Sequence, residues 1–134
     1  YLAAHKDAGL SADPALIHEV GIRTGECGGV LRKVISQGAG FTAVLAFSDI
    51  VALETLSELR SLGEEFATIP VAGFDNIQAG LILPVPLVSV GTADGSAAVW
   101  AVDMLIERMQ EKQSRQAPQP PKRVTLKVKL YFHN

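Results

Sequence analysis

The sequence predicts an α/β fold built on a largely parallel sheet. Strand-like and helix-like runs alternate along all 134 residues. Residues 41–75 form one strand, helix, strand unit, with the length that a right-handed parallel crossover requires. The strand within 42–47 is continuously apolar, which is typical of a strand buried on both faces. We therefore expect three layers, with helices on both faces of the sheet.

The elements expected before residue 41 are a helix end, a short strand and a second helix. Residues 1–10 should end a helix, with Gly9 in the left-handed conformation. A turn at Asp13 and Pro14 should lead into a short strand at residues 15–20. The second helix should begin near residue 24 and end before two glycines, and its apolar positions are Val30, Leu31, Val34 and Ile35.

The central unit places polar side chains where its strands end. We predict a strand at 42–47, a helix from Asp49 to about Gly63 and a strand at 68–74. The helix should bury a stripe made of Ala52, Leu53, Leu56 and Leu59. Past the carboxyl ends of the two strands lie Ser48, Asp49, Asp75 and Asn76. Ligands bind at this edge in open parallel sheets.

The remainder of the chain should add two strands and one long helix. We expect a loop at 76–86, a short strand at 87–90, a helix at 96–113, a proline-rich linker at 113–121 and a strand at 124–130. The predicted buried stripe of the long helix consists of Val99, Val102, Leu105, Ile106 and Met109. In the final strand, Val124, Leu126, Val128 and Leu130 alternate with polar residues, which predicts one buried and one wet face.

The composition of the chain argues against several classes of protein. Apolar residues make up 48% of the chain and charged residues 19%, so most of it should fold. The net charge of −2 does not indicate a nucleic-acid surface. No apolar run reaches the roughly 18 residues of a membrane span, and the start lacks the order of a signal peptide, so we predict a cytoplasmic protein.

No pattern for catalysis, metal binding or a cofactor is found. Cys27 is the single cysteine, and we interpret it as a small packing residue near a helix start. His5, His18 and His133 lack metal-ligand spacing. The residues around Ser48 do not form a nucleophile elbow, and the glycines at 25–29 lack a P-loop's Lys-Ser/Thr. We therefore predict no cofactor, no metal and no enzymatic activity.

Several runs together carry a family resemblance. They are TAVLAFSDIVALETLSELRSLG, IPVAGFDNI, PLVSV, MLIERM before the proline-rich linker, and the opening AHKDAGLSADPALI. This order resembles the effector-binding region of lactose-repressor and galactose-repressor type transcription factors. The resemblance implies a periplasmic-binding-protein-like (type I) fold whose two lobes hold a sugar or nucleobase between them. Residues 1–134 would be mainly the C-terminal lobe, with 91–113 returning toward the N-terminal lobe and the operator-binding helix-turn-helix domain outside the chain.

The resemblance suggests which residues contact the ligand. Asp75 can accept hydrogen bonds from vicinal hydroxyls, or it can cap the turn that follows. Ser48 and Asp49 are ligand candidates that can also serve as helix N-caps. Arg23 can pair with an acidic ligand or lie in solvent, and Thr92 stands where the family often has a Gln contact.

The apolar loop after Asp75 suggests a homodimer. Its residues are Leu81, Ile82, Leu83, Val85 and Pro86, which are costly to leave in water. In the family this region helps form the dimer. The sequence as a whole therefore predicts the ligand-sensing domain of a bacterial transcriptional repressor. The alternatives are a solute-binding protein for sugar transport and a small α/β enzyme.

Overall fold

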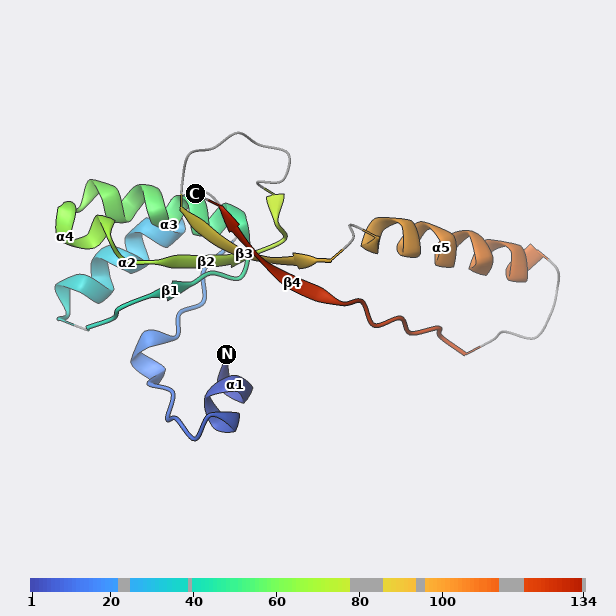
Figure 1. Ribbon diagram of the computed structural model, residues 1–134, viewed down its shortest axis with the longest axis horizontal. Helices are drawn as coiled ribbons and strands as arrows, with labels where there is room; N and C mark the ends of the chain where they lie inside the picture. The colour runs from blue at the N-terminus through green and yellow to red at the C-terminus, as the bar shows by residue number, and fades with distance from the viewer. Residues whose placement is uncertain (22–24, 39, 78–85, 94–95, 114–119, 134) are drawn as a thin grey trace.

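The sheet at the centre of the chain has four strands. The computed structural model describes residues 1–21, 25–38, 40–77, 86–93, 96–113 and 120–133. Strands β1 (Val44–Leu45), β2 (Val71–Phe74), β3 (Leu87–Thr92) and β4 (Val128–His133) lie side by side in that order (Figure 1). The first three are parallel and β4 runs antiparallel to β3. The predicted α/β class with a largely parallel sheet is confirmed.

Three helices form the layer that covers one face of this sheet. They are α2 (Glu26–Ser36), α3 (Asp49–Ser61) and α4 (Glu64–Ala67). Leu31 of α2 and Leu56 of α3 join Val71 and Leu87 of the sheet in one buried cluster. The stripe predicted for α3 is confirmed, because Ala52, Leu56 and Leu59 are buried and Leu53 is partly buried. This packing fixes the start of α3 against the carboxyl ends of β1 and β2.

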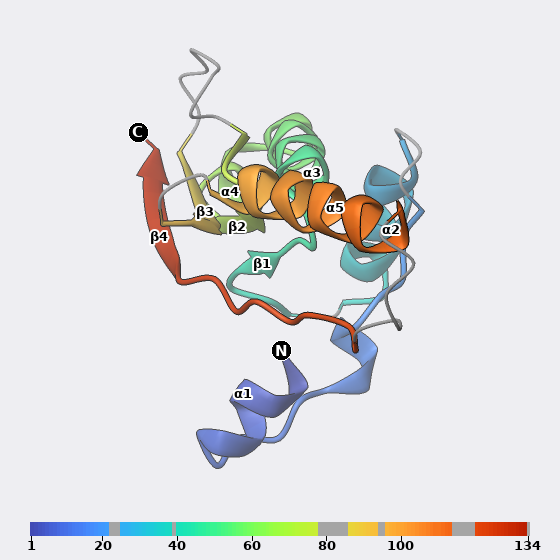
Figure 2. The same ribbon diagram turned by 90° about the vertical axis from the view of Figure 1, so that its right-hand side faces the viewer.

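The opposite face of the sheet is open among the described residues. The register places Leu45, Phe74 and Leu130 on this face, and they are 51%, 37% and 55% exposed. The prediction that the strand within 42–47 is buried on both faces is therefore wrong for the described chain. Helix α1 (Leu2–Asp7) has no buried residue and lies apart from the helical layer (Figure 2). The third layer stays a prediction.

The short strand predicted at residues 15–20 does not form. A 3-10 turn, η1 (Pro14–Leu16), begins there instead, because the Asp13 carboxylate accepts a hydrogen bond from the N–H of Ala15 at 2.9 Å. Gly9 has a φ of 68°, as predicted for a residue that follows a helix. Local side-chain capping therefore determines the backbone conformation of a segment that the sequence pattern predicted to be a strand.

The final strand buries the face opposite to the one that the sequence predicted. Val128, Leu130 and Phe132 are exposed, whereas Tyr131 and His133 are partly buried. Pairing with β3 causes this, since Tyr131 lies opposite the buried Ser89 and His133 lies opposite the buried Leu87. The strand also begins at residue 128 rather than 124. His133 is thereby placed on the helix-covered side of the sheet.

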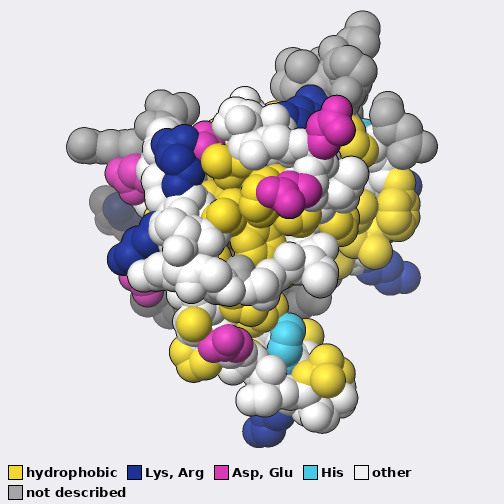
Figure 3. Space-filling model, turned by 90° about the vertical axis from the view of Figure 1, so that its left-hand side faces the viewer, with side chains coloured by type: hydrophobic (Ala, Val, Ile, Leu, Met, Phe, Trp, Pro, Cys, Tyr) yellow, Lys and Arg dark blue, Asp and Glu magenta, His cyan; other side chains and the backbone are white. Residues whose placement is uncertain are grey.

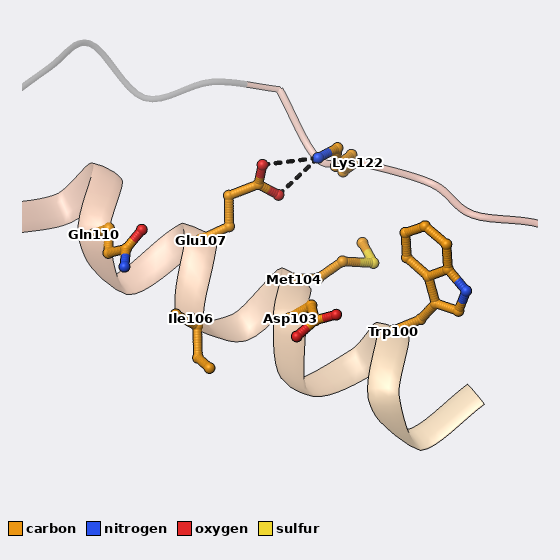
Figure 4. A pocket seen from close by; sticks show the side chains of 7 residues that line it. All are labelled: Trp100, Asp103, Met104, Ile106, Glu107, Gln110 and Lys122. Atoms are coloured by element: carbon orange, nitrogen blue, oxygen red, sulfur yellow. Dashed lines mark hydrogen bonds and ion pairs between the residues drawn. The ribbon is translucent and has the colours of Figure 1, made fainter. Parts of the chain in front are cut away.

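Helix α5 (Ala97–Gln113) projects away from the sheet (Figure 1). No residue of α5 is buried, so the prediction of a buried stripe is wrong within the described chain; Leu105 is 60% exposed. Residues 120–127 run alongside the helix, where Lys122 Nζ pairs with Glu107 at 2.7 Å (Figure 4). Trp100 and Met104 lie on the same side of α5 as Lys122.

Hydrophobic side chains also cluster at the centre of the face of the molecule that carries α2 and α4 (Figure 3). An apolar groove runs along β1 between α2 and the segment after η1, and Val20, Leu31, Phe41 and Val44 are among its lining residues. Among the described helices, none combines the length and the apolar character needed to cross a membrane.

Candidate functional site

The turn at the carboxyl end of β2 has an unusual backbone. Asp75 has a φ of 97° and Asn76 a φ of 53°, and they are the two non-glycine residues with positive φ among those described. Such conformations cost free energy and persist only where surrounding contacts impose them. Asp75 is exposed and Asn76 is partly buried. The turn therefore holds a carboxylate at the edge of the sheet in a conformation that the local sequence does not favour.

Three consecutive backbone N–H groups hold this turn in place. The N–H of Asp75 donates to the carbonyl oxygen of Val90 at 2.9 Å. The next N–H, of Asn76, donates to Ser89 Oγ at 2.9 Å, and that of Ile77 donates to Asp49 Oδ2 at 2.9 Å. Each donor thus has an acceptor from β3 or from the start of α3. Asp75 can present its carboxylate to solvent without using it to stabilise its own turn.

Asp49 connects these contacts within the core. Its side chain has no exposed surface, and Ser89 Oγ–H donates to Oδ1 at 2.7 Å and to Oδ2 at 2.8 Å. The N-terminal end of α3 favours an acid at this position. Gly73 leaves the space required, since a Cβ there would stand 2.5 Å from Asp49 Oδ1. This enclosed geometry suits a positioning role, and the ligand contact of Asp49 stays a prediction.

The other two described ligand candidates lie at the same sheet edge. Ser48 is the N-cap of α3, and its Oγ accepts from the N–H of Val51 at 3.4 Å. It is partly buried, as is Thr92 at the end of β3. Because β1, β2 and β3 are parallel, their carboxyl ends bring Ser48, Asp75 and Thr92 to one edge.

The remaining predicted positions fall largely outside the described residues. This applies to Arg23 and to Leu81, Ile82, Leu83 and Val85 of the predicted dimer loop. Pro86 is described and is exposed. The ligand contact of Arg23 and the role of the loop remain predictions.

Neither the apolar groove along β1 nor a hollow on α5 includes Asp75 among its lining residues, and the groove reaches Phe47, next to Ser48. The hollow on α5 is lined by residues such as Trp100 and Met104, and the groove includes Cys27 and Thr55.

Burial raises the pKa of the Cys27 thiol; Glu54 and Glu58 raise it further, and the hydrogen bond with Thr55 opposes the shift. Cys27 is thus a packing residue with low thiolate content. Among the described residues, no group of three potential ligands is arranged to hold a metal ion.

Three residues that contact the turn were not predicted from the sequence. They are Ser89, Gly91 and His133. Ser89 interrupts the apolar run LVSV, and a polar residue within a buried strand needs a partner, so this signal was available. The role of His133 could not be predicted because its face of β4 depends on the register with β3.

Comparison with known proteins shows what the chain resembles. No family model matches it. A PurR transcriptional repressor from Aliivibrio fischeri is 30% identical over 112 residues, which are 81% of this chain and 33% of that repressor. The predicted resemblance is confirmed. The chain is related to the lactose- and galactose-repressor family of transcriptional regulators.

Solved structures of this family have the same fold. A CelR transcriptional regulator in complex with cellobiose matches 98% of this chain and 39% of its own, with a TM-score of 0.78 and 22% identity. A sugar-binding LacI-family regulator from Escherichia coli, complexed with phosphate, matches 96% of this chain and 45% of its own, with a TM-score of 0.72 and 23% identity. The periplasmic-binding-protein-like fold class is confirmed. The chain spans about a third of the length of the curated relative.

Proposed function

We propose that this chain is the larger part of one lobe of an effector-sensing domain in a bacterial transcriptional repressor. Its relationship to PurR repressors supports a regulator, and these relatives are repressors rather than enzymes. The whole protein would bind operator DNA through a helix-turn-helix domain outside this chain, act in the cytoplasm and form a homodimer. Helix α5 would belong to the return toward the second lobe.

The observation that carries the proposal is the geometry of Asp75. Its carboxylate is exposed at the sheet edge, while Val90, Ser89 and Asp49 satisfy the N–H groups of its turn. An ionised carboxylate only accepts hydrogen bonds, so it suits a ligand with vicinal hydroxyls or ring N–H groups. The effector class would be a sugar or a nucleobase.

Ser48 and Thr92 would complete the contact set from this lobe. Both have hydroxyl groups that can donate and accept, and both lie at the edge that Asp75 occupies. Asp49 would position the turn rather than touch the ligand. A ligand between the lobes would favour one lobe arrangement through its higher affinity for it, and that preference would change operator binding.

A thermal-shift screen of the full-length protein tests the proposal. The panel contains cellobiose, D-glucose, D-ribose, adenine and guanine. We expect at least one of them to raise the melting temperature, and Asp75→Asn to abolish the increase. Asp7→Asn, which changes another exposed carboxylate in α1, is the matched control and should leave it intact. An increase that survives Asp75→Asn would refute the assigned contact.

A transport function is the second candidate, because the fold also suits solute-binding proteins. The repressor relationship favours regulation. Gel-shift measurement with operator DNA separates the two functions, since only a regulator changes its DNA affinity when the effector is added.

A further inference from the structure

The C-terminal strand contacts the Asp75 turn through one side-chain hydrogen bond. His133 Nε2 lies 2.9 Å from Asn76 Oδ1, and the pair is partly buried. Because an amide oxygen only accepts, the imidazole Nε2–H is the donor. His133 stands at the far end of β4, opposite Leu87 of β3. The last strand therefore reaches across β3 to the turn that ends β2.

The Asn76 side chain has little freedom to move away from this contact. A Cβ added at Gly91 would stand 2.6 Å from Asn76 Cβ and 3.2 Å from a ring carbon of Tyr131. The Tyr131 hydroxyl is itself fixed, since it donates to the carbonyl oxygen of Thr92 at 2.8 Å. Asn76 is thus packed against Gly91 and held by His133.

The backbone couples Asn76 to the exposed carboxylate. Asp75 and Asn76 are adjacent and share the peptide that joins two positive-φ residues. A change in the φ of Asn76 turns this peptide relative to the Asn76 side chain, so a fixed side chain restricts the peptide and with it the direction of the Asp75 side chain. Asn tolerates the left-handed region better than most residues, but the φ of 97° at Asp75 requires external support.

We propose that His133 is a positioning residue for Asp75, acting through Asn76. The inference rests on the proposed function, in which Asp75 contacts the effector. The hydrogen bond from His133 fixes the Asn76 side chain, the Asn76 side chain fixes the shared peptide, and the peptide fixes the direction of the carboxylate. This contact also joins the site to the β3–β4 pair, which extends toward α5 (Figure 1).

Amide hydrogen exchange in the ligand-free, full-length protein tests this assignment. We expect His133→Leu to speed exchange at residues 75–77 about fivefold, as loss of one hydrogen bond predicts. Exchange within α3 should stay unchanged. His133→Gln keeps a side-chain N–H donor and should restore slow exchange. His18→Leu removes an exposed imidazole and is the matched control.

A double variant distinguishes loss of the contact with Asn76 from a general destabilisation of the sheet by the change at His133. In Asn76→Gly the acceptor is gone and glycine adopts positive φ freely, so adding His133→Leu should change exchange at residues 75–77 no further. Unchanged exchange in His133→Leu overturns the proposal. So does an increase that Gln fails to reverse, or one that persists in full in the Asn76→Gly background.

The outcome is separate from that of the ligand screen. No ligand enters the exchange experiment, so it can succeed even when Asp75→Asn leaves the thermal shift intact, which is the result that refutes the proposed function. Conversely, the ligand contact can stand while the positioning role of His133 fails.

Discussion

Gly91 of β3 leaves the space that the Asn76 side chain fills, since a Cβ at residue 91 would stand 2.6 Å from Asn76 Cβ. Gly91 is buried and lies opposite Lys129 of β4. A residue without a side chain in mid-strand is usually unfavourable, and here it admits a neighbouring turn. The glycine in PLVSVG is therefore explained by the turn of Asp75 rather than by a bend in β3.

Gly91→Ala should destabilise the protein by about 1–3 kcal/mol, because the new methyl group overlaps Asn76 and presses on Tyr131. Chemical denaturation measures the change. Gly29→Ala in α2 is the control, since no other part of the fold lies within 4 Å of a Cβ added there and alanine favours a helix by about 0.5–1 kcal/mol. Equal effects of the two substitutions would contradict the packing described.

Ser89→Ala should cost about 2–3 kcal/mol, because it removes the acceptor of the Asn76 N–H and a donor to the buried Asp49 carboxylate. Urea unfolding of Ser89→Ala, Asp49→Asn and the double variant gives the coupling energy. We expect it to exceed about 0.5 kcal/mol. Ser61→Ala removes an exposed hydroxyl that donates to its own helix and should change stability by less than about 0.5 kcal/mol. Additive effects at residues 49 and 89 would contradict the shared network.

Cys27 should make the protein less stable at alkaline pH. Burial raises the pKa of its thiol in the folded state, so the folded chain holds its proton at pH values where the unfolded chain has released it. The contribution of the protonated thiol to the free energy of unfolding is complete below the unfolded pKa of about 8.5, and it is lost as pH rises through the folded pKa. Urea unfolding from pH 7.5 to 10 should show a smaller decline in Cys27→Ala than in the wild type. Parallel pH profiles would show that the thiol is not responsible.

The elements found from the sequence are those that local patterns specify. The stripe of α3 has the helical period, and Ser48 and Gly63 mark its two ends, so the helix was predicted nearly to the residue. The position of Asp75 at the end of β2 followed from the apolar run before it. These features depend on neighbours in the chain.

The features missed depend on contacts between distant residues. Residues 15–20 have a strand-like composition but no strand partner among the described residues, and Asp13 caps a 3-10 turn instead. The buried face of β4 was reversed because the register with β3 sets it, and alternation alone does not say which face is inward. The enclosure of Asp49 depends on Ser89, which is 40 residues away. A helix cap was visible in the sequence, whereas this network was not.

Leu105 tests whether α5 packs against a second lobe, as the proposed function requires. The side chain is 60% exposed on a helix without buried residues. An exposed leucine can be replaced by alanine with a change below about 0.5 kcal/mol, whereas a buried one costs about 2–5 kcal/mol. In the full-length protein we expect Leu105→Ala to cost at least about 2 kcal/mol in urea unfolding, because covering α5 would bury the apolar row that Leu105 shares with Val102 and Met109. Lys112→Ala, on the same helix and exposed, should remain within about 0.5 kcal/mol of the wild type. A near-zero effect of Leu105→Ala would show that this face of α5 is exposed to solvent in the full-length protein. It would contradict the proposal that α5 belongs to the return toward a second lobe.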